Sequence, residues 1–312
     1  MICRAIAPAI VGGTRIASRR GLSSVRALTP AVGATLSLED LGLSLSSPED
    51  HSAAAEAVHR VVMDHGVCFL RRGDNNNNNV EDDEDDKALV SFARRLGELE
   101  KPHPIYSPDP TSPLAVVAHD AEHPPDGAEW HTDCSWSEAP PFASVLWPRL
   151  LPATGGGDTL WLSTSAAFES LPQGMQSDLR SLEAVHDMGS FRNAYAANGG
   201  GAAGIAEGHA RFGSAIYPVV RAHPVTGREC LFVNESFTAS VVGLMADESR
   251  RLLSYLFDHM QRPDYQCRWR WQLGDVAIWD NRSTQHYACA DYAGYSRRMH
   301  RVTVLDDRIG GT

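Results

Sequence analysis

Two short motifs, far apart in the sequence, contain the side chains best suited to chemistry. The first is His131-Thr132-Asp133, and the second holds His286, with Arg297 a short distance downstream. Because side chains alternate along an extended strand, His131 and Asp133 would lie on the same face. An imidazole from another strand, His286, would complete three ligands on one side of a metal. Two histidines and one carboxylate with the opposite face open suit a non-haem Fe(II) site that also holds a cosubstrate and O2. The residues therefore predict an iron-dependent oxygenase.

Other interpretations of these residues stay open at this point. Two histidines and a carboxylate also serve catalytic zinc, so a zinc hydrolase is one alternative. His131 and Asp133 could instead be surface residues, and His286 a core histidine. However, only His131 among the 13 histidines is followed two residues later by an acidic residue. Arg297 also favours the oxygenase, because a guanidinium returned beside the metal could bind one end of a dicarboxylate bidentately.

Composition limits the partners that we expect. The formal net charge of -11 argues against nucleic acid, because phosphate binding needs a basic face. No apolar run approaches the roughly 18 residues that would span a bilayer, so we expect no membrane segment. The partner predicted by the two motifs is a small anionic organic substrate. Self-association into a homo-oligomer is compatible with the sequence, but no interface patch is identifiable in it.

The N-terminal segment differs in charge from the rest of the chain. Residues 1–30 contain five arginines and no acid, and the first carboxylate is Glu39. Such a segment resembles a mitochondrial transit peptide, with residues 19–24 as a processing region. We therefore expect residues 1–35 to be a targeting sequence and the protein to be mitochondrial. The alternative is a disordered basic tail on a cytoplasmic protein.

The six cysteines are scattered, with no CxxC pair among them. This distribution predicts reduced thiols rather than a disulfide framework or a zinc site. They are Cys3, Cys68, Cys134, Cys230, Cys267 and Cys289.

The remaining sequence predicts one mainly β domain with flanking helices over residues 36–312. Helical periodicity marks residues 53–66, 88–96, 165–171 and 247–260. From about residue 114 onward, short apolar runs alternate with Pro and Gly, which favours an antiparallel sandwich or barrel. The acidic, low-complexity stretch 73–87 should be a disordered surface insertion, and the Gly- and Ala-rich stretch 197–208 a mobile loop.

Several ordered motifs also follow one another from about residue 67 to the end of the chain, interrupted by the acidic insertion. They are Gly97-Glu98-Leu99, His103-Pro104-Ile105-Tyr106, Trp130-His131-Thr132-Asp133, Gly156-Gly157-Asp158-Thr159-Leu160-Trp161, His223-Pro224-Val225-Thr226-Gly227, Leu231-Phe232-Val233-Asn234-Glu235, Phe237-Thr238, Trp269-Arg270-Trp271-Gln272, Trp279-Asp280-Asn281-Arg282, His286-Tyr287-Ala288, Asp291-Tyr292 and Arg297-Arg298-Met299-His300-Arg301. In these motifs the chain resembles the taurine/alkylsulfonate dioxygenases, within the wider Fe(II)/2-oxoglutarate-dependent family that also contains aryloxyalkanoate enzymes.

The resemblance implies a double-stranded β-helix fold, the cupin-like jelly roll. It implies Fe(II) held by His131, Asp133 and His286, with 2-oxoglutarate and O2 as cosubstrates. Arg297 and Thr159 would hold the far carboxylate of 2-oxoglutarate. The glycine run before Thr159 is not followed by the GK[ST] of a phosphate loop, so we interpret it as a turn that presents Thr159.

The resemblance also implies a substrate site, in which a sulfonate lies between His103 and Arg301 and is lined by Tyr106 and Phe237. The enzyme would hydroxylate the carbon next to the sulfonate and release sulfite and an aldehyde, together with succinate and CO2. One position departs from the taurine enzymes, which carry an Asn where this chain has Gly127. An alkyl sulfate ester or an aryloxyalkanoate is therefore an alternative substrate, and a non-catalytic relic of the family is a further alternative.

Overall fold

The computed structural model describes residues 24–71, 83–101, 109, 111–123, 125, 128–189 and 201–312. The largest sheet among them has seven strands. Its strand order is β1 (Val25–Ala27), β2 (Ala34–Leu36), β3 (Val67–Leu70), β13 (Val276–Asp280), β5 (Ala143–Leu150), β15 (Arg297–Val304) and β4 (Ala115–His119). Neighbouring strands are antiparallel except for β2 and β3, which are parallel. The strands that carry the C-terminal motifs therefore lie in the middle of the sheet.

A second sheet faces the first and completes a sandwich. It consists of β12 (Gln266–Trp269), β6 (Thr159–Ser163) and β14 (Thr284–Ala288). A core of aromatic side chains fills the space between the sheets and includes Phe69, Trp161 and Trp279. The rings of Trp161 and Trp279 lie 5.6 Å apart, one from each sheet. Burial of such large rings dominates the energetics of a core, so this contact fixes the two sheets against each other.

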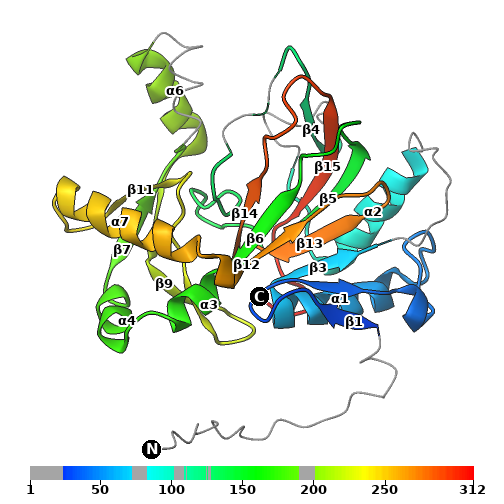
Figure 1. Cartoon of the computed structure of the whole chain (residues 1–312), viewed down its shortest axis with the longest axis horizontal. Helices are drawn as coiled ribbons and strands as arrows, with labels where there is room; N and C mark the ends of the chain where they lie inside the picture. Colours follow the sequence, from blue (N-terminus) through cyan, green and yellow to red (C-terminus); the bar gives the residue numbers. More distant parts are fainter. Residues whose placement is uncertain are drawn as a thin grey trace, which may run out of the picture.

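Two helices cover the outer face of the seven-stranded sheet: α1 (His51–His65) and α2 (Asp83–Leu96). The four residues of β3 are all buried because Val67 and Phe69 join the inter-sheet core while Cys68 and Leu70 pack in the cluster that also contains residues of α1 and α2. Period-two alternation places these two pairs on opposite faces of the strand. Figure 1 shows both helices on the same side of the molecule as β3.

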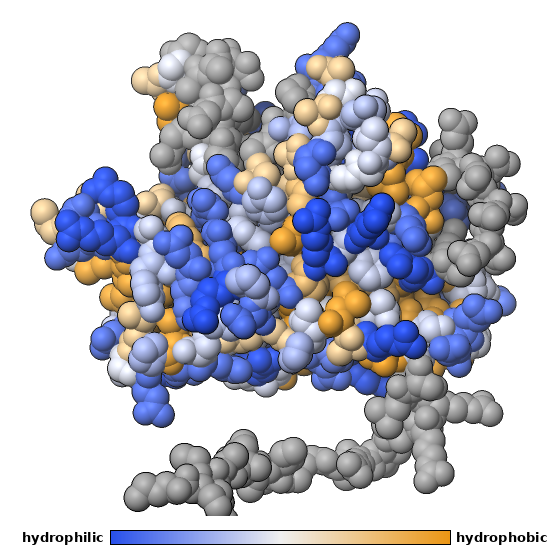
Figure 2. Space-filling view, in the orientation of Figure 1, coloured by the Kyte–Doolittle hydropathy of each residue, from blue (hydrophilic) through white to orange (hydrophobic). Residues whose placement is uncertain are grey.

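A second group of elements lies to one side of the sandwich (Figure 1). It includes the sheet of β11 (Thr238–Val241), β7 (Glu183–His186) and β8 (Ala215–Pro218), and the hairpin of β9 (Val220–Ala222) and β10 (Glu229–Leu231). Its helices are α3 (Thr164–Glu169), α4 (Gln173–Leu179), α6 (Ala202–Phe212), α7 (Ala246–Met260) and the 3-10 helix η2 (Pro263–Tyr265). The 3-10 helix η1 (Glu39–Leu41) does not belong to this group, because it follows β2. These elements lie apart from α1 and α2 in Figure 1. On the face drawn in Figure 2, hydrophilic residues surround separate hydrophobic patches.

The predicted fold class, mainly β with flanking helices in a jelly-roll arrangement, is confirmed. The boundary after residue 35 is wrong, because β1 and β2 pair with each other and join the large sheet. Residues 1–23 lie outside the described residues, so the targeting role stays a prediction. No helix within the described ranges is long and apolar enough to cross a membrane.

The predicted disordered insertion at residues 73–87 is wrong over its last five residues. Helix α2 begins at Asp83, so residues 83–87 are helical, while residues 72–82 lie outside the described residues. Acidic side chains at a helix N-terminus are favoured by the helix dipole. Asp86 is also held in place, because its carboxylate accepts hydrogen bonds from the indole of Trp147 at 2.8 Å and from Arg149 at 3.3 Å.

The predicted mobile loop at residues 197–208 is also wrong over its second half. Helix α6 starts at Ala202, directly after Gly201, whose φ is 72°. Alanine has the highest helix propensity, and an Ala-rich segment forms a helix when its neighbours allow it. Residues 190–200 lie outside the described residues.

Candidate metal centre

The two histidines of the predicted site come together through their backbones. His131 and His286 form an isolated antiparallel bridge, in which each backbone N–H donates to the carbonyl of the other at 3.1 and 2.9 Å. His286 lies within β14, which pairs with β6 along its whole length. As a result the two imidazole rings lie 4.1 Å apart. Residues distant in sequence are thus fixed side by side by main-chain hydrogen bonds.

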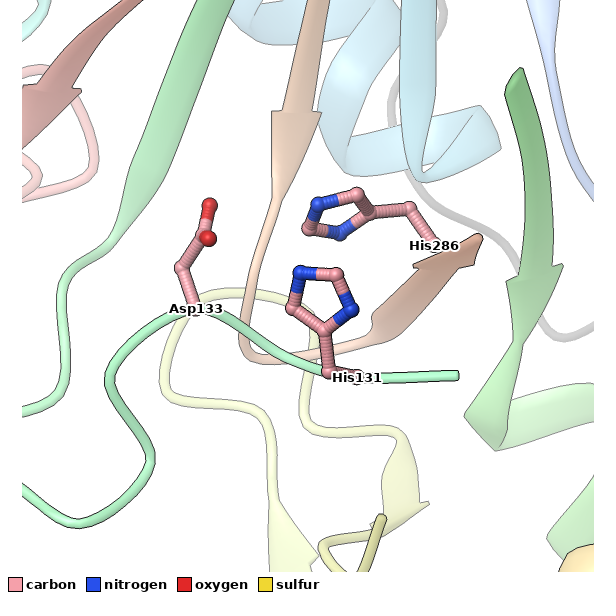
Figure 3. A group of neighbouring side chains, drawn as sticks. All are labelled: His131, Asp133 and His286. Carbon is pink, nitrogen blue, oxygen red and sulfur yellow. The ribbon is translucent and has the colours of Figure 1, made fainter. Parts of the chain in front are cut away.

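Asp133 completes the cluster, as Figure 3 shows. One ligand atom from each of His131, Asp133 and His286 lies within 4.8 Å of the others. Within the described ranges, no other group of His, Cys, Asp or Glu side chains meets this condition. His131 and Asp133 come from one segment, two residues apart, and His286 comes from the neighbouring strand.

A hydrogen bond prepares His131 for a metal, and burial prepares His286. Nδ1 of His131 lies 2.9 Å from the carbonyl oxygen of Glu129, and when this nitrogen donates to it, Nε2 keeps its lone pair. His286 is buried beside Trp279, with 4.7 Å between ring centres. Burial, together with the nearby His131, lowers the pKa of His286 well below its ordinary value. The first contact leaves Nε2 of His131 available, and the lowered pKa favours the neutral form of His286, which is the form that binds metals.

The carboxylate of Asp133 is ionised and anchored. Its Oδ2 accepts a hydrogen bond from the hydroxyl of Ser144 at 2.7 Å, and its Oδ1 accepts one from Arg301 at 2.8 Å. Burial alone would raise the pKa of Asp133, but the charge of Arg301, with smaller contributions from His286 and His131, holds it well below the usual range. Each carboxylate oxygen has two lone pairs, so these contacts leave capacity for a metal.

Ser144 was not predicted from the sequence. It lies within the apolar strand β5 and is fully buried. A serine in such a run has no spacing signal that would identify its partner, because the hydrogen bond to Asp133 depends on the pairing of distant segments.

Arg297 and Thr159, the residues expected to hold the cosubstrate, are both buried. Arg297 is 4% exposed, and among the described residues no carboxylate forms an ion pair with it and no acceptor binds its Nε. Burial lowers the pKa of Arg297 relative to its ordinary value. The hydroxyl of Thr159 accepts a hydrogen bond from the indole of Trp271 at 3.0 Å. A buried guanidinium without an acidic partner is costly unless an anion binds it.

The expected substrate residues are only partly described. Phe237 is buried and lies edge-on to His131, with 6.0 Å between ring centres, and Trp136 packs behind it at 4.5 Å. Arg301 contacts the predicted metal ligand Asp133 directly, a contact that sequence reasoning did not foresee. His103, Tyr106 and Gly127 lie outside the described residues.

The residues present fit a ferrous ion and a dicarboxylate. Two neutral imidazoles and one ionised carboxylate are the donor set of non-haem Fe(II) oxygenases. Nδ1 of the buried His286 has no hydrogen-bond partner among the described residues, and the same is true of Nε in Arg297. A carboxylate near Arg297 would remove the cost of leaving its Nε unsatisfied.

Comparison with known proteins decides the family. Residues 24–303 match the model of the Taurine catabolism dioxygenase TauD, TfdA family. This chain is a member of the TauD/TfdA family. It is therefore an iron- and 2-oxoglutarate-dependent dioxygenase, and the zinc hydrolase alternative is not supported.

Three relatives of this TauD/TfdA dioxygenase show how far the similarity extends. An alpha-ketoglutarate-dependent sulfate ester dioxygenase of Pseudomonas putida is 34% identical over 285 residues, 88% of each chain. An alkylsulfatase of Acinetobacter baylyi is 34% identical over 295 residues, 92% of this chain and 86% of its own. The crystal structure of a taurine dioxygenase from Burkholderia xenovorans superposes with a TM-score of 0.68 at 27% identity, over 91% of this chain and 89% of its own.

Proposed function

We propose that this dioxygenase hydroxylates the carbon next to a sulfonate, with taurine or a related alkylsulfonate as substrate. The products would be sulfite and an aldehyde, together with succinate and CO2. The observation that carries the proposal is the convergence of His131, Asp133 and His286 within 4.8 Å, with Arg301 bound to the ligand Asp133. The matching family and the Burkholderia structure are both named for taurine, which is a sulfonate, and this supports a sulfonate as the substrate.

An alkyl sulfate ester is the second candidate, for two reasons. The relatives from Pseudomonas and Acinetobacter are named for sulfate esters and alkyl sulfates. Gly127 also stands where the taurine enzymes carry an Asn, so the amine of taurine would lose one partner. Hydroxylation of the carbon that bears the ester oxygen would release sulfate and an aldehyde. An aryloxyalkanoate would use the same chemistry, with Arg301 pairing a carboxylate.

His131, Asp133 and His286 would hold the Fe(II), with Glu129 and Ser144 orienting two of these ligands through hydrogen bonds of 2.9 and 2.7 Å. Hydrogen bonds to the ligands of a metal fix their orientation and raise their basicity. Before a metal binds, the orientation of the His131 and Asp133 side chains should therefore depend on these two hydrogen bonds.

Arg297 and Thr159 would bind the far carboxylate of 2-oxoglutarate. The planar guanidinium of Arg297 can donate two parallel hydrogen bonds to a carboxylate. In the protein interior such a pair of hydrogen bonds is stronger than at the surface, provided that the polar atoms of both groups all have partners. Arg297 is buried and forms no ion pair with a carboxylate of the described residues, which supports this role.

The substrate would lie beside Arg301 and Phe237, with His103 and Tyr106 as further predicted contacts. A guanidinium has five N–H donors, so Arg301 can bind Asp133 and an anionic group of the substrate at the same time. Phe237 lies against His131 and would bring the carbon chain of the substrate close to the metal ligands. The target carbon would then be held next to the reacting centre rather than sampling the solvent.

When bound, iron, 2-oxoglutarate and O2 would supply the oxidation, in which one oxygen atom of O2 goes to the keto acid as it loses CO2 to form succinate, and the other becomes the hydroxyl group of the substrate carbon. The protein orients the two anions through Arg297 and Arg301 and excludes water with buried aromatic rings such as Trp161 and Trp279. A carbon that bears both hydroxyl and sulfonate then collapses to the aldehyde and sulfite.

A product assay with three substrate classes tests this proposal. Purified enzyme with Fe(II), ascorbate and 2-oxoglutarate is supplied with taurine and other alkylsulfonates, alkyl sulfates or aryloxyacetates. We expect sulfite and succinate in a one-to-one ratio with an alkylsulfonate. Sulfate release from an alkyl sulfate alone would establish the second candidate. Succinate formed only with an aryloxyacetate would overturn both, since neither sulfur oxyanion would then be the substrate.

We further propose that residues 1–23 target the protein to mitochondria, on the basis of their arginines and lack of acids. A fusion of residues 1–40 to a fluorescent reporter tests this, and a diffuse cytosolic signal would contradict it. Self-association would be measured by sedimentation of the purified chain. Binding to nucleic acid is not expected, because the net charge is -11.

A further inference from the structure

Asp291 and Tyr292, in the turn between β14 and β15, contact both sides of the predicted cosubstrate site. The carboxylate of Asp291 accepts a hydrogen bond from the backbone N–H of Gly157 at 2.7 Å, next to the strand that begins with Thr159. The ring of Tyr292 lies under the guanidinium of Arg297, with 5.7 Å between the guanidinium carbon and the ring centre. Two adjacent residues thus contact the two segments that carry Thr159 and Arg297.

Tyr292 is fixed from its far end. Its side chain is buried, with 3% of the residue exposed, and its hydroxyl lies 3.0 Å from Nδ1 of His119. His119 pairs with Arg297 in the ladder between β4 and β15. The hydrogen bond therefore ties the tyrosine to the strand beside the arginine. Because Tyr292 is held at its hydroxyl and packs with its face, it limits the directions in which the guanidinium of Arg297 can point.

Asp291 fixes the glycine loop before Thr159. Gly155, Gly156 and Gly157 have φ values of 81°, 88° and 69°, a left-handed conformation that other residues rarely adopt. A Cβ on Gly157 would lie 2.8 Å from Cδ and from Nε of Arg297. Position 157 must therefore be glycine for the arginine to occupy its place. Such a loop has high conformational freedom, and the bond from Gly157 to Asp291 removes part of it.

We propose that Asp291 and Tyr292 are positioning residues for the cosubstrate, which together align Thr159 and Arg297 on the far carboxylate of 2-oxoglutarate. This inference rests on the proposed roles of Thr159 and Arg297. Asp291 acts through the glycine loop, and Tyr292 acts through the guanidinium and its hydrogen bond to His119. Neither residue touches the metal ligands, so their effect is confined to the end of the cosubstrate that lacks the keto group.

The test compares two keto acids that differ only at that end. 2-Oxoglutarate carries the far carboxylate, and 2-oxovalerate has the same chain length with a methyl group instead. Binding of each to the Mn(II)-loaded full chain is measured by calorimetry, which needs no turnover. For Tyr292→Phe, which keeps the ring and loses the bond to His119, we expect 2-oxoglutarate to bind about three- to tenfold more weakly. Binding of 2-oxovalerate should be unchanged.

Tyr295→Phe is the matched control for Tyr292. Tyr295 is only three residues away, and its side chain is exposed. It should leave both dissociation constants as in the wild type. Equal weakening of both keto acids in Tyr292→Phe would indicate a general loss of structure and would overturn the proposal, as would no change in either.

Asp291 is tested with a pair of variants, of which one keeps the acceptor oxygen and the other removes it. Asp291→Asn keeps an oxygen that can accept from Gly157, whereas Asp291→Ala removes it. We expect the alanine variant to lose discrimination between the two keto acids and the asparagine variant to retain most of it. Arg268→Gln controls for the ion pair with Asp291, whose atoms lie 3.6 Å apart.

The same assay separates this inference from the proposed function. If Arg297→Ala leaves the preference for 2-oxoglutarate intact, the role of Arg297 itself is wrong. If Arg297→Ala abolishes the preference while the Tyr292 and Asp291 variants keep it, only the positioning role is wrong.

Discussion

Two buried clusters of this protein contain similar residues and differ in how their polar atoms are satisfied. The metal centre combines His131 and His286 with Asp133 and an arginine. A second cluster combines two histidines, two aspartates and an arginine: His59, His223, Asp280, Asp307 and Arg282. In residue types alone the two would be hard to distinguish.

In the second cluster each histidine binds a carboxylate directly. His223 lies 2.9 Å from Asp280 and His59 lies 2.9 Å from Asp307, while Arg282 joins the two acids at 2.7 and 2.9 Å. In the metal centre the two imidazoles and the carboxylate of Asp133 converge, but among the described residues neither imidazole forms a hydrogen bond with this carboxylate. Nδ1 of His286 has no hydrogen-bond partner among the described residues. A saturated cluster stabilises the fold, whereas a convergent and unsaturated one binds a ligand.

The strongest way to break this comparison is to remove a ligand from the metal centre. For His131→Ala or Asp133→Ala we expect succinate formation to fall to background, because the two ligands that remain do not hold Fe(II) at the site. Calorimetry with Fe(II) under anaerobic conditions should show the loss of metal binding, and circular dichroism should show a retained fold. Near-native turnover in either variant would show that the ligand set is wrong.

The corresponding change in the second cluster should affect folding instead. Asp280→Ala leaves the buried His223 without its carboxylate and the partly buried Arg282 with Asp307 alone, which costs about 3–5 kcal/mol of unfolding free energy. Urea unfolding measures this loss, and the folded fraction should keep its activity. Asp247→Ala is the control, because Asp247 pairs with arginines at the surface and should contribute less than about 1 kcal/mol. Equal stability of the two variants would contradict a structural role for the second cluster.

The sequence predicted the metal centre better than the second cluster, for a physical reason. His131 and Asp133 are only two residues apart, so their proximity is local although Asp133 begins a turn and not a strand, and the family motif identified His286. His59 and Asp307 are far apart in sequence, and nothing in their surroundings indicates that they meet. Such pairs depend on the packing of the whole domain.

The same distinction explains the errors in the predicted elements. The acidic segment at residues 83–87 has few apolar residues, and composition alone predicts disorder there. It is helical in the structure, where hydrogen bonds join Asp86 to Trp147 and Arg149 of β5 and to His300 of β15. Long-range anchoring of this kind has no signature in the local sequence.

Ser144 allows a sharper test, because it lies between the two clusters. Its hydroxyl donates to Asp133, and the amide of Asn281, which follows Asp280, lies 3.3 Å from it. For Ser144→Ala we expect Fe(II) to bind about 10- to 100-fold more weakly, since an orienting hydrogen bond to a ligand is lost. The turnover rate at saturating Fe(II) should stay near the wild-type rate. Ser137→Ala, at a partly exposed position, is the control, and an unchanged Fe(II) affinity in Ser144→Ala would show that Asp133 needs no support.

The smallest expected effect is the response of the second cluster to acid. Burial would raise the pKa of Asp280, but its hydrogen bonds to His223 and Arg282 and the charge of Arg282 hold it below the ordinary value. In the unfolded chain the pKa of an aspartate is about 3.9. A carboxyl group with a lower pKa in the folded state stabilises the protein above the unfolded value and loses this contribution as the pH falls through the folded pKa.

We therefore expect the stability advantage of the wild type over Asp280→Asn to be largest above about pH 5 and to narrow below about pH 4. Urea unfolding of both proteins from pH 3 to pH 6 measures this difference. Asp133 is present in both proteins, so its own titration cancels in the comparison. An advantage that stays constant down to pH 3 would mean that the charge of Asp280 contributes nothing, and that hydrogen bonding alone stabilises the saturated cluster.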